Sequence, residues 1–221
     1  MTSQEMLSHI DHTQLKAFAT WEDIKMLCDE AVLYKTASVC IPSCYVKRVK
    51  ECYGDTINIC TVVGFPLGYA NTEAKVAETK KAIEDGASEI DMVINISDVK
   101  NGMCDAVEEE IRTLKTTCGD KILKVIIETC YLTQDEKIAM CKAVTDAGAD
   151  YIKTSTGFGT GGATMEDVRL MKEHIGANVK IKAAGGVSTI EDLENFLNAG
   201  CDRIGTSKAV ALFKGETAKG Y

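Results

Sequence analysis

Short β-rich runs alternate with amphipathic helical segments along the whole chain, which predicts an α/β protein with a parallel sheet. Eight such runs in 221 residues predict that the sheet closes on itself as a (β/α)8 TIM barrel. A weak internal repeat before three of the runs supports the same fold. The chain has no composition break, proline-rich linker or low-complexity tract, so we expect one barrel domain over residues 1–221 with a short N-terminal extension.

The strand candidates are short runs rich in β-branched and other apolar residues. In chain order they are Ile10–Thr13, Ser38–Ile41, Asn58–Val63, Glu89–Asn95, Leu123–Glu128, Tyr151–Thr154, Lys180–Ala184 and Arg203–Thr206. The segments between them carry apolar residues at helical intervals, as expected for helices that pack against a sheet.

Several of these helical segments begin with residues that favour helix starts. Two pairs have the spacing of a capping box, namely Thr133 with Glu136 and Ser188 with Glu191. Asn71 and Asp105 are further N-cap candidates. The helices are therefore predicted to start close to these positions.

The internal repeat consists of the runs "GASEID", "GADYIK" and "GCDRIG", each of which begins with a glycine expected to end a helix. Aligning them places Asp91, Lys153 and Gly205 at one position, on the fourth, sixth and eighth strands. Alternate strands of a (β/α)8 barrel supply one interior layer of side chains. Asp91 and Lys153 are therefore predicted to share a layer beside the space left by Gly205. A less secure alignment adds Cys40 to that layer.

Composition excludes several classes of protein. The formal net charge is -8 and no basic patch stands out, which argues against nonspecific nucleic-acid binding. The N-terminal residues form neither a signal peptide nor a membrane span. Ten cysteines without a CxxC pair, and only three histidines, predict no metal site and a reduced, cytoplasmic protein.

Charged residues recur inside the predicted barrel, and this pattern indicates chemistry. They are Asp11, Asp91, Lys124, Lys153 and Lys182. Two lysines that face one cavity depress each other's pKa, and a neutral lysine can attack a carbonyl to form a Schiff base. The alternative is that the lysines only form buried salt bridges with Asp11, Asp91 and Glu128. The convergence of three lysines with two acids favours the functional interpretation.

Glycines follow the seventh and eighth strands, where such barrels commonly bind phosphate. Gly185 and Gly186 precede a helix that Ser188 is predicted to cap, and free N–H groups at a helix start attract anions. Gly205 near the end of the last strand, with Ser207 and Lys208 directly after it, is predicted to complete the same corner. The alternative is a pair of ordinary turns made of small residues.

A second glycine-rich loop matches a dinucleotide-binding pattern, but we reject that interpretation. The match is Gly157-x-Gly159-x-x-Gly162, and the pattern also requires an acid about 20 residues later, at the end of the next strand. Here that strand reads "VKIKAAGG", which contains lysines and no acid. These glycines are expected to permit close backbone approach at a mobile rim.

The runs "EIDMVIN", "LKVIIET", "YIKTSTGF", "IKAAGGV" and "RIGTS", in this order, resemble the deoxyribose-phosphate aldolase family. The resemblance extends from Ile10 to Ser207, and the tandem of "KTSTGF" and "KAAGG" is its most specific part. It implies a class I aldolase, a carbon–carbon lyase, with Lys153 as the Schiff-base lysine. It also implies that Lys182 perturbs the pKa of that lysine and transfers protons, and that Asp91 relays protons through a water molecule.

The resemblance also implies residues around this centre. Asp11 and Lys124 match polar residues that surround the site, and Tyr221 matches a C-terminal tyrosine that assists proton exchange. The predicted substrate-binding residues are Thr13, Cys40, Thr156, Gly157, Gly185, Gly186, Ser188, Gly205, Ser207 and Lys208. Cys40 is either a thiol open to attack by reactive aldehydes or a buried core thiol.

The chain departs from the family pattern near the expected phosphate. Phe158 stands where some members of the family carry a lysine. Ser188 stands where many members carry an arginine. Lys208 stands where a serine is usual, and we hypothesise that it supplies the missing charge.

The implied reaction is reversible cleavage of 2-deoxy-D-ribose 5-phosphate into D-glyceraldehyde 3-phosphate and acetaldehyde, without metal or other cofactor. The expected partners are therefore small phosphosugars and aldehydes, with no nucleic acid and no membrane, and the resemblance is compatible with a homodimer. Two alternatives stay open. One is a Schiff-base aldolase or transaldolase-like enzyme for another phosphosugar, and the other is a noncatalytic phosphosugar-binding barrel.

Overall fold

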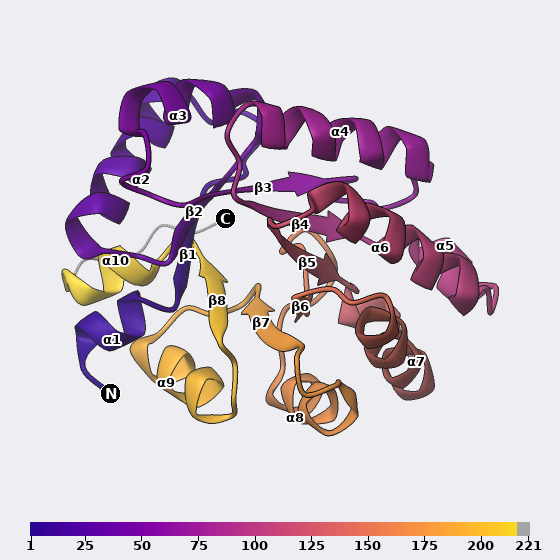
Figure 1. The fold of residues 1–221 in the computed structure, drawn as a ribbon. Helices are drawn as coiled ribbons and strands as arrows, with labels where there is room; N and C mark the ends of the chain where they lie inside the picture. Colours follow the sequence, from indigo (N-terminus) through magenta and orange to yellow (C-terminus); the bar gives the residue numbers. More distant parts are fainter. Residues whose placement is uncertain (216–221) are drawn as a thin grey trace.

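Eight parallel strands form a closed barrel in the computed structural model, which describes residues 1–215 (Figure 1). Each strand pairs with its neighbours in the sequence, and β1 closes the barrel by pairing with β8. The strands are β1 (Ile10–Thr13), β2 (Ser38–Ile41), β3 (Ile59–Val63), β4 (Glu89–Val93), β5 (Ile122–Ile126), β6 (Tyr151–Lys153), β7 (Lys180–Ala184) and β8 (Arg203–Thr206). The predicted (β/α)8 fold is therefore confirmed.

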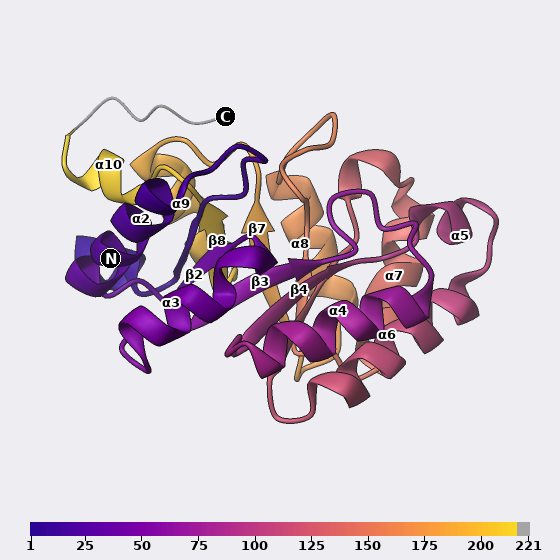
Figure 2. The same cartoon turned by 90° about the horizontal axis from the view of Figure 1, so that it is seen from above.

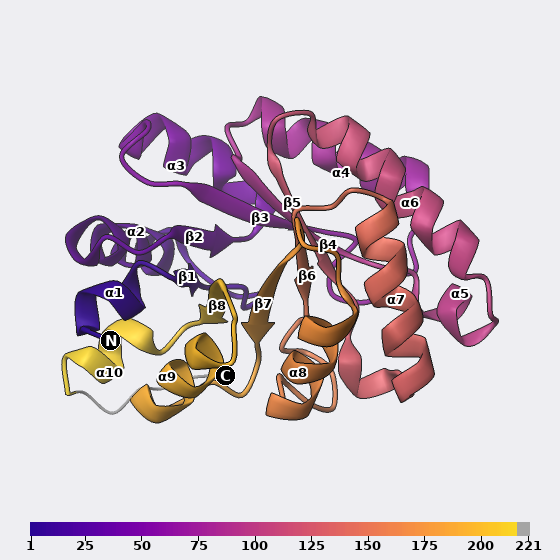
Figure 3. The ribbon, with the colours of Figure 1, turned by 60° about the horizontal axis from the view of Figure 1, so that its bottom comes forward.

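Helices connect the strands and surround the barrel (Figure 1). They are α1 (Ser3–Leu7), α2 (Trp21–Tyr34), α3 (Val46–Tyr53), α4 (Thr72–Glu84), α5 (Ile96–Lys100), α6 (Cys104–Cys118), α7 (Gln134–Asp146), α8 (Met165–His174), α9 (Ile190–Asn198) and α10 (Ala209–Phe213), with 3-10 turns at Ser43–Tyr45 and Thr129–Tyr131. The N-terminal extension is α1, which packs beside α9 and α10 (Figure 3). None of the helices in residues 1–215 is long and apolar enough to cross a membrane.

Four predicted strands are correct in place but differ at their ends. β3, β4 and β6 are shorter than predicted, and β5 is shifted by one residue at its start and by two at its end. Asn95 leaves the sheet to cap α5 with its side chain, and Glu128 adopts a left-handed backbone conformation with φ of 52°. Both positions belong to the connections above the barrel, where chain direction changes.

The predicted helix starts are confirmed at two sites and wrong at two others. Thr133 forms its capping box, and Asn71 caps α4. The box predicted at Ser188 is displaced by one residue, because Thr189 caps α9 and pairs with Asp192. Asp105 lies in the first turn of α6 rather than at its N-cap. Its carboxylate there interacts favourably with the positive end of the helix dipole.

The glycines of the internal repeat end helices as predicted. Gly86, Gly148 and Gly200 have φ angles of 110°, 75° and 104°, in a region that favours glycine over residues with a side chain. Each lies between a helix and the next strand, so the chain reverses direction there and enters the barrel with the same orientation each time.

Apolar packing lies mainly outside the barrel wall. The large hydrophobic cluster includes Val39, Ile90, Val125 and Ile152 from the strands, together with buried residues of the surrounding helices. A small second cluster has three buried members, Leu15, Cys40 and Cys60. The remaining interior is charged, and this polar interior is the feature that determines what the barrel can do.

Candidate active site

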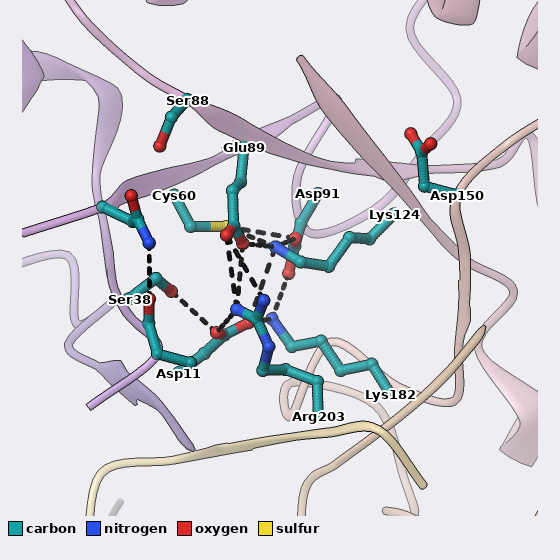
Figure 4. Close-up of polar contacts among 12 residues, drawn as sticks. Asp11, Ser38, Cys60, Ser88, Glu89, Asp91, Lys124, Asp150, Lys182 and Arg203 are labelled. Atoms are coloured by element: carbon teal, nitrogen blue, oxygen red, sulfur yellow. Dashed lines mark hydrogen bonds and ion pairs between the residues drawn. The ribbon is translucent and has the colours of Figure 1, made fainter. Parts of the chain in front are cut away.

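Charged side chains from six strands converge inside the barrel, and Figure 4 labels all of them except Lys153. They belong to Asp11 on β1, Glu89 and Asp91 on β4, Lys124 on β5, Lys153 on β6, Lys182 on β7 and Arg203 on β8. Side chains alternate between the two faces of a strand, so residues two apart, such as Glu89 and Asp91, point to the same side. The geometry therefore brings together all five interior residues that the sequence predicted.

Asp91 lies at the centre of this group. Its carboxylate oxygens are 2.7 Å from Lys153 Nζ, 2.6 Å from Lys182 Nζ and 2.9 Å from Lys124 Nζ. Oδ2 accepts hydrogen bonds from both Lys153 and Lys182, so one oxygen atom joins the two lysines. We call Asp91, Lys153 and Lys182 the upper charge layer.

A second group lies towards the start of the strands. Asp11 accepts from Arg203 Nη1 at 2.5 Å and from Ser38 Oγ at 2.7 Å, and its other oxygen is 2.5 Å from Lys182 Nζ. Glu89 lies 2.5 Å from Lys124 Nζ and 3.1 Å from Arg203 Nη1. We call Asp11, Glu89, Lys124 and Arg203 the lower charge layer, and its contacts hold Lys124 and Lys182 in place.

The predicted depression of lysine pKa values is wrong for Lys182 and Lys124. Burial opposes the charged form of Lys182, but the carboxylates of Asp11 and Asp91 outweigh burial and raise its pKa above the ordinary value. The pKa of Lys124 is raised in the same way, by Asp11 and Asp91. Burial also disfavours the Asp91 carboxylate, yet three lysines hold its pKa well below the usual range. The carboxylates determine the direction of the lysine pKa shifts, because ammonium–carboxylate attraction outweighs desolvation and lysine–lysine repulsion together.

A cavity of about 130 Å³ opens above the upper charge layer. Lys153 is part of its lining, whereas Lys124 and Lys182 are fully buried beneath it. Eight of the predicted substrate-binding residues also line it: Thr13, Thr156, Gly157, Gly185, Gly186, Gly205, Ser207 and Lys208. A Cβ atom at Gly205 would lie 3.2 Å from Lys182 Cε, so the glycine leaves room for that lysine.

Two rim loops approach each other closely beside this cavity. A Cβ atom at Gly162 would lie 2.4 Å from the backbone of Gly185, which is too close for any residue except glycine. Ala163 N–H donates to the carbonyl oxygens of Ala184 and Gly185, at 3.1 Å in each case. The loop between β6 and α8, which extends outward in Figure 2, is therefore fastened to the end of β7.

Ser188 and Cys40 are not among the residues that line the cavity. The N–H groups of Ser188 and Thr189 both donate to Asp192 at 2.9 Å, so the capping box already occupies donors that we expected at an anion site. Cys40 is fully buried below the cavity, as the core-thiol alternative requires. The cavity corner is made by Gly185 and Gly186 before α9 and by Ser207 and Lys208 before α10.

The other residues of interest lie around the rim. Phe158 is 48% exposed and its ring packs edge-on against Phe65, with centroids 5.3 Å apart. Lys208 lines the cavity, as its proposed charge-supplying role requires. Tyr221 lies outside the described residues.

Glu128 is a buried acid that we expected only as a salt-bridge partner. Its carboxylate accepts hydrogen bonds from the Thr156 N–H, at 3.1 Å, and from the Thr156 hydroxyl. Burial raises the pKa of Glu128 above the ordinary value, against the opposing effect of these hydrogen bonds and of Lys153. A left-handed conformation at a non-glycine residue is uncommon and clusters at functional sites, so Glu128 is a positioning residue for the loop that follows Lys153.

Four polar residues of the interior or its rim were not predicted from the sequence: Cys60, Glu89, Glu128 as a partner of Thr156, and Arg203. Glu89 and Arg203 lie two positions before Asp91 and Gly205, so the alternation of strand side chains could have identified them. Cys60 required the β2–β3 register, in which it lies opposite Cys40.

Two groups of possible metal ligands occur in the part of the chain that the structure describes. They are Cys40, Cys60 and Asp91, and Asp11, Cys60 and Glu89, with ligand atoms within 4.8 Å of one another. Lys124 Nζ already donates to Cys60 Sγ at 3.2 Å and to Asp91 at 2.9 Å. The ammonium group of Lys124 thus occupies the position that a metal ion would need. These side chains are therefore better suited to hold the lysine than to bind a metal ion.

A (β/α)8 barrel with a lysine that lines a cavity at the carboxyl ends of its strands suits an enzyme that forms a Schiff base with a carbonyl compound. The family comparison agrees, since the model of the DeoC/LacD family aldolases matches residues 6–211. The chain therefore belongs to the DeoC/LacD aldolase family, and it is an aldolase.

Relatives from bacteria carry a more specific name. A deoxyribose-phosphate aldolase from Clostridium botulinum is 72% identical over 221 residues, covering 100% of both chains. One from Clostridioides difficile is 60% identical over 218 residues, covering 99% of this chain and 100% of the relative. The family resemblance read from the sequence motifs is confirmed.

Solved structures share the fold as well. The deoxyribose phosphate aldolase from Aeropyrum pernix, described as a unique tetramer, has a TM-score of 0.88 and 30% identity, covering 97% of this chain and 92% of that one. A structure described as "QR15, an Aldolase" has a TM-score of 0.91 and 35% identity, covering 96% and 95%.

Proposed function

We propose that this aldolase reversibly cleaves 2-deoxy-D-ribose 5-phosphate into D-glyceraldehyde 3-phosphate and acetaldehyde, with Lys153 as the Schiff-base lysine. The observation that carries the assignment is the position of Lys153. It lines the cavity while its Nζ lies 2.7 Å from Asp91, whereas Lys182 and Lys124 are fully buried. The names of the relatives support the choice of substrate.

The first step joins substrate and enzyme. Nζ of Lys153, in its uncharged form, attacks C1 of the open-chain aldehyde, and an amine proton moves to the aldehyde oxygen. The resulting carbinolamine loses its hydroxyl group as water, and the required proton comes from Lys182, which Asp11 and Asp91 keep charged. The product is a protonated imine on Lys153, which withdraws electrons from the neighbouring carbon atoms.

The second step breaks the bond between C2 and C3, because acetaldehyde retains C1 and C2. A water held by Asp91 and Lys182 takes the C3 hydroxyl proton and passes it to Lys182, which the first step left uncharged, while the electrons of the broken bond move to the imine and form an enamine. Lys182 then protonates C2 of the enamine, and hydrolysis of the imine releases acetaldehyde, restores Lys153 and returns a proton to Lys182. Asp91 serves as a fixed negative charge, because the lysines around it keep its pKa far below neutrality.

The phosphate group is assigned to the corner formed by the turns after β7 and β8. Gly185, Gly186 and Ser207 line the cavity there, and Lys208 is the cation beside them. This corner is on the same cavity as Lys153, so one small phosphosugar can contact both.

Borohydride reduction in the presence of acetaldehyde tests the assignment directly. We expect a stable ethyl adduct on Lys153, located by peptide mapping. An adduct on Lys182 would exchange the roles of the two lysines. If the folded protein gave no adduct at either, the noncatalytic binding barrel would be the better interpretation, and profiling of other phosphosugars separates the remaining aldolase alternative.

Location and assembly are also proposals. We infer a cytoplasmic protein, because all ten cysteines are free, as expected in a reducing compartment. A homodimer stays a prediction, which light scattering on the purified protein would test.

A further inference from the structure

Two cysteines lie side by side on the inner wall of the barrel, in contact with the charged network. Cys40 on β2 and Cys60 on β3 are direct partners in the strand register. Their sulfur atoms and a carboxylate oxygen of Asp91 all lie within 4.8 Å of one another. This is a dithiol rather than an isolated buried thiol, and the proposed reaction does not use it.

The two thiols have different environments. The adjacent Cys60 thiol lowers the pKa of Cys40 against the cost of burial, and Lys182 and Lys153 act in the same direction. Burial raises the pKa of Cys60, and the nearby Asp91 carboxylate raises it further. Thiolates are the nucleophilic form of cysteine, so Cys40 is the more reactive of the pair and Cys60 is its protonated neighbour.

The geometry suits a disulfide. Directly paired residues on neighbouring strands have Cα atoms about 4.8 Å apart, within the roughly 4.4–6.8 Å that disulfides span. Both sulfur atoms face the barrel interior, so a bond between them requires only local rotation. Intracellular disulfides are usually transient and catalytic or redox-sensing, rather than structural.

A small oxidant has a route to the pair. Leu15 lines the cavity and also packs against Cys40 and Cys60, so movement of this side chain would bring the cavity to the thiols. Hydrogen peroxide is neutral and only slightly larger than water, whereas bulkier thiol reagents would be excluded because both thiols are fully buried.

We propose that Cys40 and Cys60 form a peroxide-reactive dithiol inside the barrel, with Cys40 as the attacking sulfur and Cys60 as the resolving sulfur. Cys40 sulfur attacks one oxygen of hydrogen peroxide, the O–O bond breaks, and hydroxide leaves with the thiol proton as water. Cys60 sulfur then attacks the Cys40 sulfenic acid, the S–O bond breaks, and a second water leaves. Two thiols and one peroxide become one disulfide and two waters.

Oxidation acts on the charged network. Cys60 Sγ donates to Asp91 Oδ1 at 3.1 Å and accepts from Lys124 Nζ at 3.2 Å, and a disulfide removes the donated hydrogen. Hydrogen bonds to charged groups contribute enough that we expect a loss of about tenfold or more in kcat/KM. The loss reverses when a dithiol reductant restores both thiols.

The test begins with the reduced wild-type protein. Hydrogen peroxide is added, free thiols are alkylated under denaturing conditions, and the protein is digested without reductant. We expect a cross-linked peptide that contains Cys40 and Cys60, and recovery of activity after dithiothreitol. The proposal is independent of the assigned substrate, because the peptide map needs no enzyme assay.

Variants then assign the roles. In Cys60→Ser, Cys40 should oxidise to sulfinic acid without a disulfide, and the activity that this variant retains should be lost irreversibly. Cys44→Ser and Cys52→Ser are matched controls, because both thiols are exposed, and they should keep the wild-type response. A disulfide between other cysteines, or inactivation that leaves Cys40 and Cys60 reduced, would overturn the proposal. If Cys60→Ser does not fold, the wild-type peptide map alone decides.

Discussion

The two charge layers inside the barrel are built from the same kinds of residues but differ in what surrounds them. The members of the lower layer, Asp11, Glu89, Lys124 and Arg203, pair with one another and none of them lines the cavity. The upper layer meets a cavity and glycine-rich loops, and one of its lysines, Lys153, lines that cavity. Contact with the cavity, rather than burial, thus distinguishes a charge that can react from charges that fix geometry.

The largest expected effect is at the reachable lysine. Lys153→Ala should reduce kcat by about 10⁴-fold or more, because no other group can form the imine. Lys153→Arg is the matched control, since it keeps a cation beside Asp91 but cannot serve as the nucleophile. Both variants should be equally inactive in a coupled assay for glyceraldehyde 3-phosphate, and near-normal turnover in either would contradict the mechanism.

A substitution in the lower charge layer should lower the free energy of unfolding. Arg203→Met removes one of the two cations that lie near both Asp11 and Glu89, the other being Lys124, and breaking a buried pair costs about 3–5 kcal/mol. Denaturant unfolding should show this decrease, while any folded protein retains the Lys153 adduct with acetaldehyde. Arg169→Met is a control in helix α8, and a similar loss there would remove the distinction between the layers.

The connection between β5 and the cavity should give a smaller effect. Glu128→Gln weakens the acceptor that holds the Thr156 N–H and hydroxyl, and we expect about a tenfold decrease in kcat, because misplacement of the loop after Lys153 affects the reaction. Borohydride trapping should still label Lys153. A change in stability without any change in kcat would show that Glu128 has a structural role only.

The smallest effect is expected at the phosphate corner. Lys208→Ala should raise KM for 2-deoxyribose 5-phosphate several-fold to about tenfold, because an exposed ion pair contributes about 1 kcal/mol or less and a partly buried one somewhat more. The unphosphorylated sugar should be unaffected. An unchanged preference between the two sugars would rule out phosphate binding by Lys208.

The pairing of Asp91 with Lys153 could be predicted because it depends on a periodicity. The repeat places both residues on alternate strands, and alternate strands share a layer. The pKa shift of Lys182 could not be predicted in the same way. Its sign depends on the distances to Asp11 and Asp91, and these follow from the three-dimensional arrangement of β1, β4 and β7.

The start of α9 shows why local patterns also reach a limit. Ser188 with Glu191 and Thr189 with Asp192 are overlapping pairs one residue apart, and both have capping-box spacing. The second pair forms the cap because β7 and the glycine turn after it place Thr189, rather than Ser188, at the start of α9. Asp192 then accepts from the Ser188 N–H, which changes the expected donors of the phosphate corner.

The contact between Gly162 and Gly185 has a consequence for the energetics of ligand capture. Because Ala163 already bonds to the end of β7, the two walls of the cavity keep their relative position when the site is empty. A ligand that enters such a rim loses its own freedom but does not have to immobilise two loops, and this preorganisation favours association. A methyl group at position 162 would separate the walls, so affinity for a small metabolite depends here on the absence of a side chain.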